Sequence, residues 1–149
     1  MIVVSSMFTP PNPNFERTVR DSFAEQALMA RLGASLTAVG AGRAEIELPF
    51  SAAVSQRQGR FASPAVAAVG ECAGACAALT LMPAGSEVTT VEYKINFIRP
   101  ASGNLLRASG RVMRAGQSLI VARVDVTVFG ECGESGCALL QVTLMSVEP

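Results

Sequence analysis

The chain has 149 residues, a length that fits one compact domain, and half of them are hydrophobic. Its 12 basic and 12 acidic side chains cancel, which argues against a nucleic-acid or anionic-membrane surface because such a surface needs a basic excess. Histidine is absent. Its absence excludes Ser–His and Cys–His nucleophile pairs and His-ligated zinc, and it leaves acid–base chemistry to carboxylates, Tyr93, Lys94 or a cysteine.

Residues 1–14 are interpreted as a leader that precedes a single domain of residues 15–149. The first seven residues have no positive n-region and too short an apolar run for a signal peptide, and residues 9–14 are rich in proline. The longest weakly polar stretch, residues 64–82, has a central glutamate that would be costly in lipid. The sequence therefore predicts a soluble, cytoplasmic protein without a membrane anchor.

The first predicted helix runs from Phe15 to about Leu32. Asn14 is a favoured N-cap residue, and Gly33 is a typical C-terminal stop. The apolar residues keep an approximately helical spacing, although Ser22 marks a candidate break.

The strongest helix signal begins at Ser63–Pro64, where Ser is expected as the N-cap and Pro at the first helical position. The run that follows to Leu79 is apolar on all sides, so this helix is expected to be buried, and Pro83 ends it. Gly70 and Gly74 give the helix a thin face that lets a sheet or another helix approach closely.

Elsewhere apolar and polar residues alternate, which is typical of half-buried strands. Residues 44–48 form one such run, and four longer strands are predicted at roughly 87–99, 104–114, 118–129 and 137–147. Short turns between neighbouring strands predict antiparallel pairing. The predicted fold class is α+β, with a long central helix wrapped by a curved antiparallel sheet of about five to six strands.

The four cysteines form two pairs, Cys72/Cys76 and Cys132/Cys137, whose spacings match no common zinc pattern. The first pair is interpreted as small buried hydrophobes one helical turn apart. A disulfide across the glycine-rich turn of the second pair stays an unfavoured alternative. No metal site is predicted.

Four segments carry a family resemblance: residues 56–61, the helix with an acid eight residues after Ser63, residues 89–101 and residues 110–116. Together they resemble acyl-CoA thioesterases of the phenylacetate-degradation type, which have the hotdog fold. The resemblance extends from about Phe15 to the C-terminus. It departs from the family at residues 62–64, where relatives usually have His-Gly-Gly and this chain has Ala-Ser-Pro.

The resemblance implies four catalytic residues. Glu71 corresponds to the helix acid that attacks the thioester carbonyl or activates water, and the backbone N–H of Ser63 to the donor for the thioester oxygen. Gln56 stands where relatives have an amide that orients water or substrate, and Thr90 where they have a helping hydroxyl. Pro64 has no N–H, so any donor at that position is lost.

Each of these residues also has a structural interpretation. Glu71 could pair with an arginine, and Ser63 could be a plain N-cap. Thr90 could be only a β-former, and Gln56 only a loop residue. For Glu71 the catalytic interpretation is preferred, because a charge among Ala, Val, Gly and Cys needs a reason.

Five further residues are candidates for binding the substrate and its coenzyme A: Gly59, Arg60, Phe61, Arg111 and Arg114. Eleven of the 12 basic side chains are Arg, and guanidinium groups suit the phosphates of coenzyme A. For any single arginine, a solvated strand end is the alternative. Coenzyme A enters here as part of the substrate, and no separate cofactor is predicted.

Helix geometry predicts a homodimer. Ser63 and Glu71 are eight residues apart, which is about 12 Å along a helix axis, whereas an oxyanion donor must lie within roughly 3 Å. One carbonyl cannot touch both in one subunit, so the helix start of one protomer must meet Glu71 of another in an isologous dimer. The resemblance implies the same assembly, in some members paired again into a dimer of dimers.

The predicted function is hydrolysis of an acyl-CoA thioester to a free acid and coenzyme A. Whether Glu71 acts as base or nucleophile stays open. One alternative is a non-catalytic hotdog protein that binds acyl-CoA or an acyl carrier. Another is a purely structural oligomer.

Overall fold

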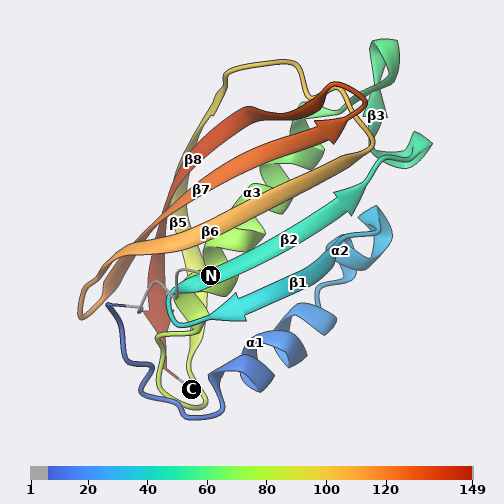
Figure 1. Cartoon of the computed structure of the whole chain (residues 1–149). Helices are drawn as coiled ribbons and strands as arrows, with labels where there is room; N and C mark the ends of the chain where they lie inside the picture. The colour runs from blue at the N-terminus through green and yellow to red at the C-terminus, as the bar shows by residue number, and fades with distance from the viewer. Residues whose placement is uncertain (1–6, 149) are drawn as a thin grey trace.

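The computed structural model describes residues 7–148 (Figure 1). Residues 1–6 of the predicted leader lie outside the described residues, and residues 7–14 form no helix or strand. The boundary of the domain at residue 15 stays a prediction. Within residues 7–148, no helix is both long and apolar enough to cross a membrane.

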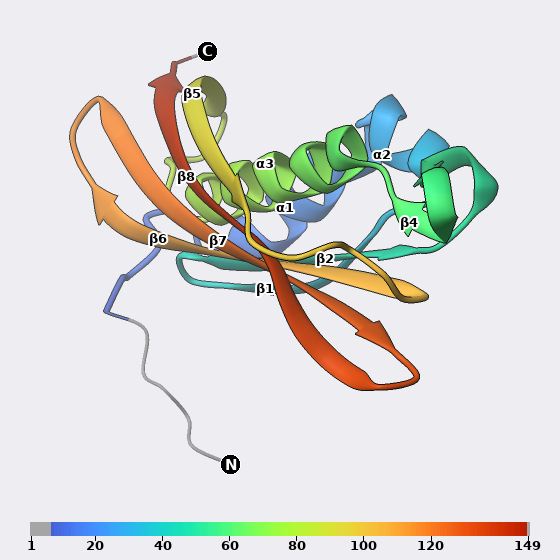
Figure 2. The ribbon, with the colours of Figure 1, turned by 90° about the horizontal axis from the view of Figure 1, so that it is seen from above.

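Six strands form one antiparallel sheet in the order β1-β2-β6-β7-β8-β5. Their bounds are β1 (Ser35–Gly40), β2 (Arg43–Pro49), β5 (Glu87–Phe97), β6 (Leu105–Ala115), β7 (Leu119–Gly130) and β8 (Gly133–Val147). The sheet curves around the long helix α3 (Ser63–Leu79), as Figure 2 shows. This arrangement confirms the predicted α+β class and its central helix.

Short elements fill the rest of the chain. They are α1 (Phe15–Ala24), α2 (Ala27–Leu32), two single-turn 3₁₀ helices (Ala52–Val54 and Arg57–Gly59), β3 (Ser55–Gln56) and β4 (Arg60–Phe61). Strands β3 and β4 pair as a separate two-stranded ribbon just before α3.

The first predicted helix is two helices. The break falls at Glu25–Gln26 and not at Ser22, because Gln26 has a non-helical backbone (φ −75°, ψ 89°). Gly33 ends α2 with a φ of +85°, a conformation that favours glycine, so the predicted stop is confirmed. Asn14 occupies the N-cap position, but its side chain makes no capping hydrogen bond.

Helix α3 and its N-cap both lie one residue earlier in the chain than predicted. Ala62, with an extended backbone, is the N-cap, and its carbonyl accepts hydrogen bonds from the N–H groups of Ala65 and Val66 at 3.0 and 3.1 Å. Ser63 is therefore the first helical residue, and the prediction that it caps the helix is wrong. Pro64 occupies the second helical position.

Neighbouring strands pair as predicted for β6–β7 and β7–β8, but not for β5–β6. β5 pairs with β8 instead, and residues 98–104 carry the chain from this edge of the sheet to β6 in its interior. A link of that length does not force its flanking strands into a hairpin, as a two-residue turn does. β5 is consequently an edge strand.

Strand β8 begins at Gly133, earlier than the predicted position 137. The ladder to β7 continues from Thr127 opposite Gly136 to Gly130 opposite Gly133. The glycine-rich segment therefore extends the hairpin and forms a shorter turn than predicted.

The contact between α3 and the sheet depends on glycines. A Cβ at Gly70 would lie 2.8 Å from a methyl of Leu140, and one at Gly74 would lie 3.0 Å from the nearest atom of β8. On the facing strand, a Cβ at Gly110 would lie only 2.4 Å from the carbonyl oxygen of Ala73. The predicted thin face is confirmed.

The opposite face of α3 is only partly covered. Ala67, Ala68, Glu71 and Ala75 are half-buried, and Pro64 is exposed. The prediction of burial on all sides is therefore wrong for one protomer, because the sheet wraps one side of the helix and leaves this stripe open.

Candidate active site

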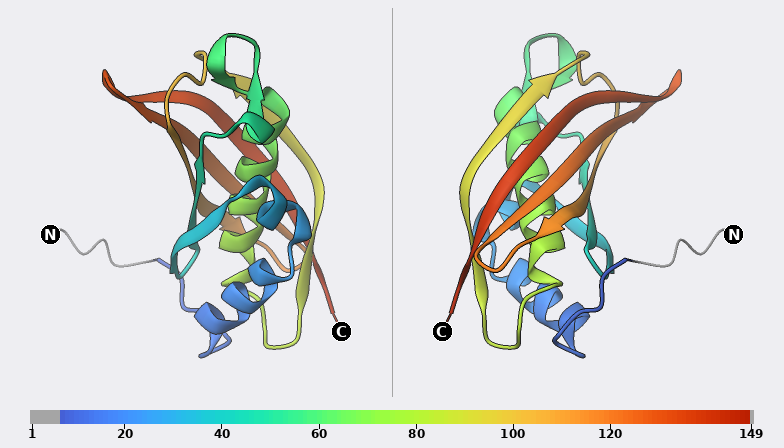
Figure 3. Two further views of the ribbon diagram at one scale, coloured as in Figure 1. Left: turned by 90° about the vertical axis from the view of Figure 1, so that its right-hand side faces the viewer. Right: turned by 90° about the vertical axis from the view of Figure 1, so that its left-hand side faces the viewer.

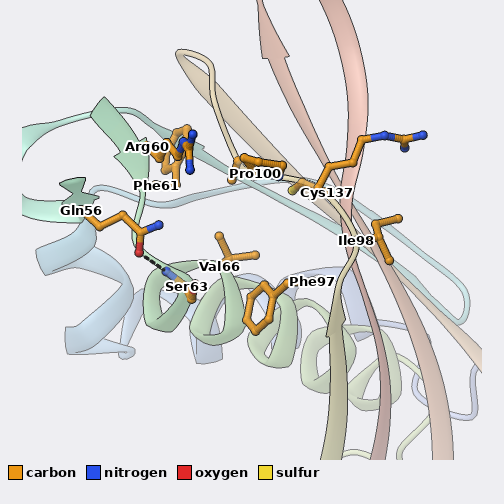
Figure 4. A pocket seen from close by; sticks show the side chains of 11 residues that line it. Gln56, Arg60, Phe61, Ser63, Val66, Phe97, Ile98, Pro100 and Cys137 are labelled. Carbon is orange, nitrogen blue, oxygen red and sulfur yellow. Dashed lines mark hydrogen bonds between the residues drawn. The ribbon is translucent and has the colours of Figure 1, made fainter. Parts of the chain in front are cut away.

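A pocket of about 290 Å³ lies at the start of α3 (Figure 4). Its walls are the β3–β4 ribbon, the first turn of α3, the end of β5 with the segment that follows it, and one residue of β8. The lining residues are Gln56, Arg60, Phe61, Ser63, Val66, Phe97, Ile98, Arg99, Pro100, Ala101 and Cys137. Four of the predicted site residues thus come together in one place.

The turn between β3 and β4 positions this side of the pocket. Gln58 and Gly59 both have a φ of +65°, in the left-handed region, so the chain reverses within three residues. Phe61 is buried and packs edge-to-face on Phe50, with ring centroids 5.2 Å apart. Phe61 therefore anchors the ribbon, Gly59 contributes its backbone to the turn, and Arg60 lines the pocket.

The backbone N–H of Ser63 points at the side chain of Gln56. It donates to Gln56 Oε1 at 3.4 Å, a long hydrogen bond that Figure 4 draws as a dashed line. The next two N–H groups of the helix donate to the Ala62 carbonyl, and Pro64 has none. A substrate oxygen at this helix start would therefore use the Ser63 N–H and displace the Gln56 amide.

Glu71 lies about two turns further along α3, on the partly exposed face. Its Oε1 accepts a hydrogen bond from the hydroxyl of Thr90 on β5. Within the described part of the chain, the carboxylate has no other hydrogen-bond partner and no Arg or Lys in ion-pair range. The alternative in which an arginine neutralises Glu71 therefore does not hold in the protomer.

Two cysteines, Cys72 and Cys137, do not compete with Glu71 as nucleophiles. A hydrogen bond with Cys76, burial and the charge of Glu71 raise the pKa of the Cys72 thiol far above its usual range. Burial raises the pKa of Cys137, which lines the pocket, to about 11. Both stay protonated near neutral pH, and only a thiolate is a strong nucleophile.

All four cysteines are free thiols, and only Cys132 is exposed. Among residues 7–148, no cluster of three or more Cys, Asp or Glu could hold a metal ion.

Arg111 and Arg114 lie away from this pocket. Both are exposed on β6, where Arg111 stands opposite Arg43 of β2 and Arg123 of β7. The residue before it, Gly110, packs on the middle of α3, so this part of β6 is remote from the helix start. Neither arginine lines the pocket of its own protomer.

Arg99 lines the pocket but was not among the predicted binding residues. Sequence reasoning also passed over Phe97, Ile98, Pro100 and Cys137, which line the pocket. The available signal was the segment of residues 89–101, whose end carries much of the family resemblance and forms one wall here.

Comparisons with known proteins identify the family. The model of the thioesterase superfamily matches residues 63–131. The crystal structure of a thioesterase family protein from Silicibacter pomeroyi is 35% identical in sequence, with a TM-score of 0.89 over 91% of this chain and 99% of that one. The chain belongs to the thioesterase superfamily.

Two further matches extend the comparison of this superfamily member. The PaaI protein of the Escherichia coli phenylacetic acid degradation operon shares the fold, with a TM-score of 0.80 and 15% identity over 92% of this chain and 96% of that one. A Saccharolobus solfataricus protein described as a candidate esterase is 32% identical over 84 residues, which are 56% of this chain and 59% of that protein. The hotdog thioesterase resemblance is confirmed, while the roles of individual residues stay predictions.

Proposed function

We propose that this protein hydrolyses an acyl-CoA thioester to a free acid and coenzyme A, with Glu71 as the catalytic carboxylate. The observation that carries the proposal is the environment of Glu71. It is the one charged residue of α3, it lies on the open face, and it is held by Thr90 without a neutralising cation among the described residues. Family membership supports thioester hydrolysis, and the sequence resemblance supports coenzyme A as the thiol.

Two routes are open to this carboxylate. As a general base, Glu71 takes a proton from water while the water oxygen attacks the carbonyl carbon. The tetrahedral intermediate then collapses, the C–S bond breaks, and the coenzyme A thiolate takes up the proton. As a nucleophile, Glu71 forms an anhydride and releases the thiolate, and water hydrolyses the anhydride. In both routes the Thr90 hydroxyl orients the carboxylate.

The oxyanion donor comes from a second copy of the chain in this proposal. Ser63 and Glu71 are eight residues apart, or about 12 Å along α3, so one carbonyl cannot reach both in a protomer. An isologous homodimer with antiparallel α3 helices would place the Ser63 N–H of each copy near Glu71 of the other.

The exposed side of β5 supports this dimer. β5 is an edge strand of 11 residues, and Val91, Tyr93 and Phe97 on it are 55%, 44% and 49% exposed. A long edge with exposed apolar side chains favours pairing with another chain. A dimer of dimers and a cytoplasmic location remain proposals from the sequence.

Arginines at the start of α3 fit the phosphate-bearing part of the substrate. Arg60 and Arg99 both line the pocket there, and guanidinium groups bind phosphate well. Arg111 and Arg114 could add to this site only from another protomer. Coenzyme A is part of the substrate, and the proposed reaction uses no separate cofactor.

One observation favours a second candidate, a protein that binds acyl-CoA or an acyl carrier without turnover. The Ser63 N–H already donates to Gln56, and Pro64 offers no second donor. If the Gln56 amide is not displaced, a bound thioester would lack an oxyanion donor and would stay intact.

Free-thiol release from short, long and aromatic acyl-CoAs tests the proposal. We expect Glu71→Gln to lower turnover by about 10²- to 10⁴-fold without changing the oligomeric state. The matched control is Glu16→Gln, an exposed carboxylate on α1, which should leave turnover unchanged. Full activity in Glu71→Gln would reject its role, and binding by the wild type without thiol release would select the second candidate.

A further inference from the structure

A second cavity, of about 540 Å³, lies between α1, the second half of α3 and the start of β5. Figure 3 shows α1 alongside this half of α3. The volume is within the roughly 300–1,000 Å³ that is usual for small-molecule sites. The α3 wall is apolar, with Ala75, Leu79 and the protonated thiol of Cys72.

Glu71 and Thr90 do not line this cavity, but each shares a face of its helix or strand with a residue that does. Ala75 is one helical turn after Glu71, so the two side chains share a face of α3. Val88, also in the lining, is two residues before Thr90 and shares its face of β5. A carbonyl carbon at Glu71 would therefore have this cavity immediately beside it, toward the end of α3.

The rim of the cavity is acidic. Asp21, Glu25 and Glu87 belong to its lining, and no Lys or Arg of the described chain does. Asp21 shares its charge with Arg17 across 3.6 Å, whereas Glu25 and Glu87 have no ion-pair partner within residues 7–148. The rim therefore carries a net negative charge.

Charge thus separates the two cavities. The pocket at the start of α3 is lined by Arg60 and Arg99 and by no carboxylate of the described residues. The second cavity is lined by carboxylates and by no basic side chain of the described residues. Phosphate groups suit the first and are disfavoured in the second, which leaves the second for the acyl part of the substrate.

We propose that this second cavity receives the acyl group, and that its carboxylates select acyl chains whose far end bears a hydroxyl or ammonium group over chains that end in a carboxylate. A hydroxyl or ammonium end donates hydrogen bonds to carboxylates, whereas an anionic end meets like charge. The rim is solvent-exposed and therefore screened by salt, so the selection is about tenfold. This inference rests on the proposed hydrolase and adds its substrate class.

The test compares kcat/KM for four matched substrates: hexanoyl-CoA, 6-hydroxyhexanoyl-CoA, 6-aminohexanoyl-CoA and adipoyl-CoA. We expect the hydroxy and amino substrates to be hydrolysed about tenfold faster than adipoyl-CoA. The triple variant Asp21→Asn, Glu25→Gln, Glu87→Gln should reduce this ratio to about twofold, and added NaCl should reduce it in the wild type. Glu16→Gln, on α1 outside the lining, should preserve the ratio.

A second variant tests the placement of the acyl group. Ala75→Leu would fill part of the cavity and should slow hexanoyl-CoA much more than acetyl-CoA, whose acyl group ends near Glu71. The readout is a ratio between two substrates, so a partial loss of folded protein cancels. Equal slowing of both substrates would contradict the placement.

The outcomes separate this inference from the proposed function. If adipoyl-CoA is hydrolysed as fast as the hydroxy substrate, or if the triple variant leaves the ratio unchanged, the selection by the rim is wrong and the hydrolase proposal stands. If the wild type releases thiol from none of these acyl-CoAs, the hydrolase proposal fails and this inference fails with it.

Discussion

The two faces of α3 are built under different constraints. Toward the sheet, small residues bring backbones so close that Gly110 has no room for a Cβ beside Ala73. On the other face, Glu71 lies among half-buried alanines and is held by one hydroxyl. The first face is complete within one protomer. The second is open, and in our proposal a substrate and a second copy of the chain complete it.

The largest expected effect comes from a substitution that disrupts the contact between α3 and the sheet. In Gly110→Ala, the new Cβ meets a backbone carbonyl, which cannot rotate away as a flexible side chain can. We expect a loss of about 3 kcal/mol or more in the free energy of unfolding, measured by urea denaturation.

Gly40→Ala is the matched control for this variant. Gly40 also lies in a strand, but a Cβ there would have no neighbour within 4 Å and its φ is not positive. The control should change stability by less than about 0.5 kcal/mol. Equal stability of the two variants would show that the helix and sheet are less closely packed than the structure has them.

The closed face was predictable because local pattern determines it. Gly70 and Gly74 predicted a close contact between α3 and the sheet, and the alternation of apolar and polar residues identified the strands. The partner of β5 was not predictable in the same way. Alternation tells which side chains face the core, but not which strand lies next to which, and residues 98–104 are long enough for either arrangement.

The open face was predictable in residue types but not in geometry. Resemblance pointed to Glu71 and Thr90, and the structure joins them by a hydrogen bond. The resemblance could not show that the Ser63 N–H already donates a hydrogen bond to Gln56, because that contact depends on the turn through Gln58 and Gly59. Arg111 and Arg114 were chosen for the chemistry of their guanidinium groups, which carries no information on distance, and they lie away from the pocket.

An intermediate effect is expected from removing the hydrogen bond that Thr90 donates to Glu71 on the open face. Thr90→Val keeps the side-chain shape but removes the hydroxyl that donates to Glu71. Hydrogen bonds to charged groups contribute about 1.5–3 kcal/mol, so we expect kcat for acyl-CoA hydrolysis to fall by about ten- to a hundredfold. KM should change little, because the hydroxyl contacts the carboxylate and not the acyl chain.

Two controls accompany Thr90→Val. Thr90→Ser retains a hydroxyl and should recover most of the activity. Thr89→Val alters the neighbouring exposed threonine, whose side chain points to the other face of β5, and should leave kcat unchanged. An equal loss in Thr89→Val would assign the effect to the strand and not to the hydrogen bond.

The smallest expected effect concerns Cys137, a buried residue of β8 at the wall of the pocket. Its side chain lines the pocket at the start of α3, yet burial raises its pKa from about 9 to about 11. Between these values the unfolded thiol loses its proton while the folded thiol keeps it, so stability falls as pH rises. At pH 10 this loss is about 1 kcal/mol for the single group.

The measurement is the difference in unfolding free energy between pH 8 and pH 10 for Cys137→Ala and for Cys132→Ala. Other groups titrate in this range, but they do so equally in both variants. The Cys132→Ala variant keeps the buried Cys137 thiol, so it should retain the full fall in stability. Cys137→Ala should show a fall smaller by about 1 kcal/mol. An identical fall in both would mean that water reaches the Cys137 thiol and that the pocket wall belongs to the open side of the molecule.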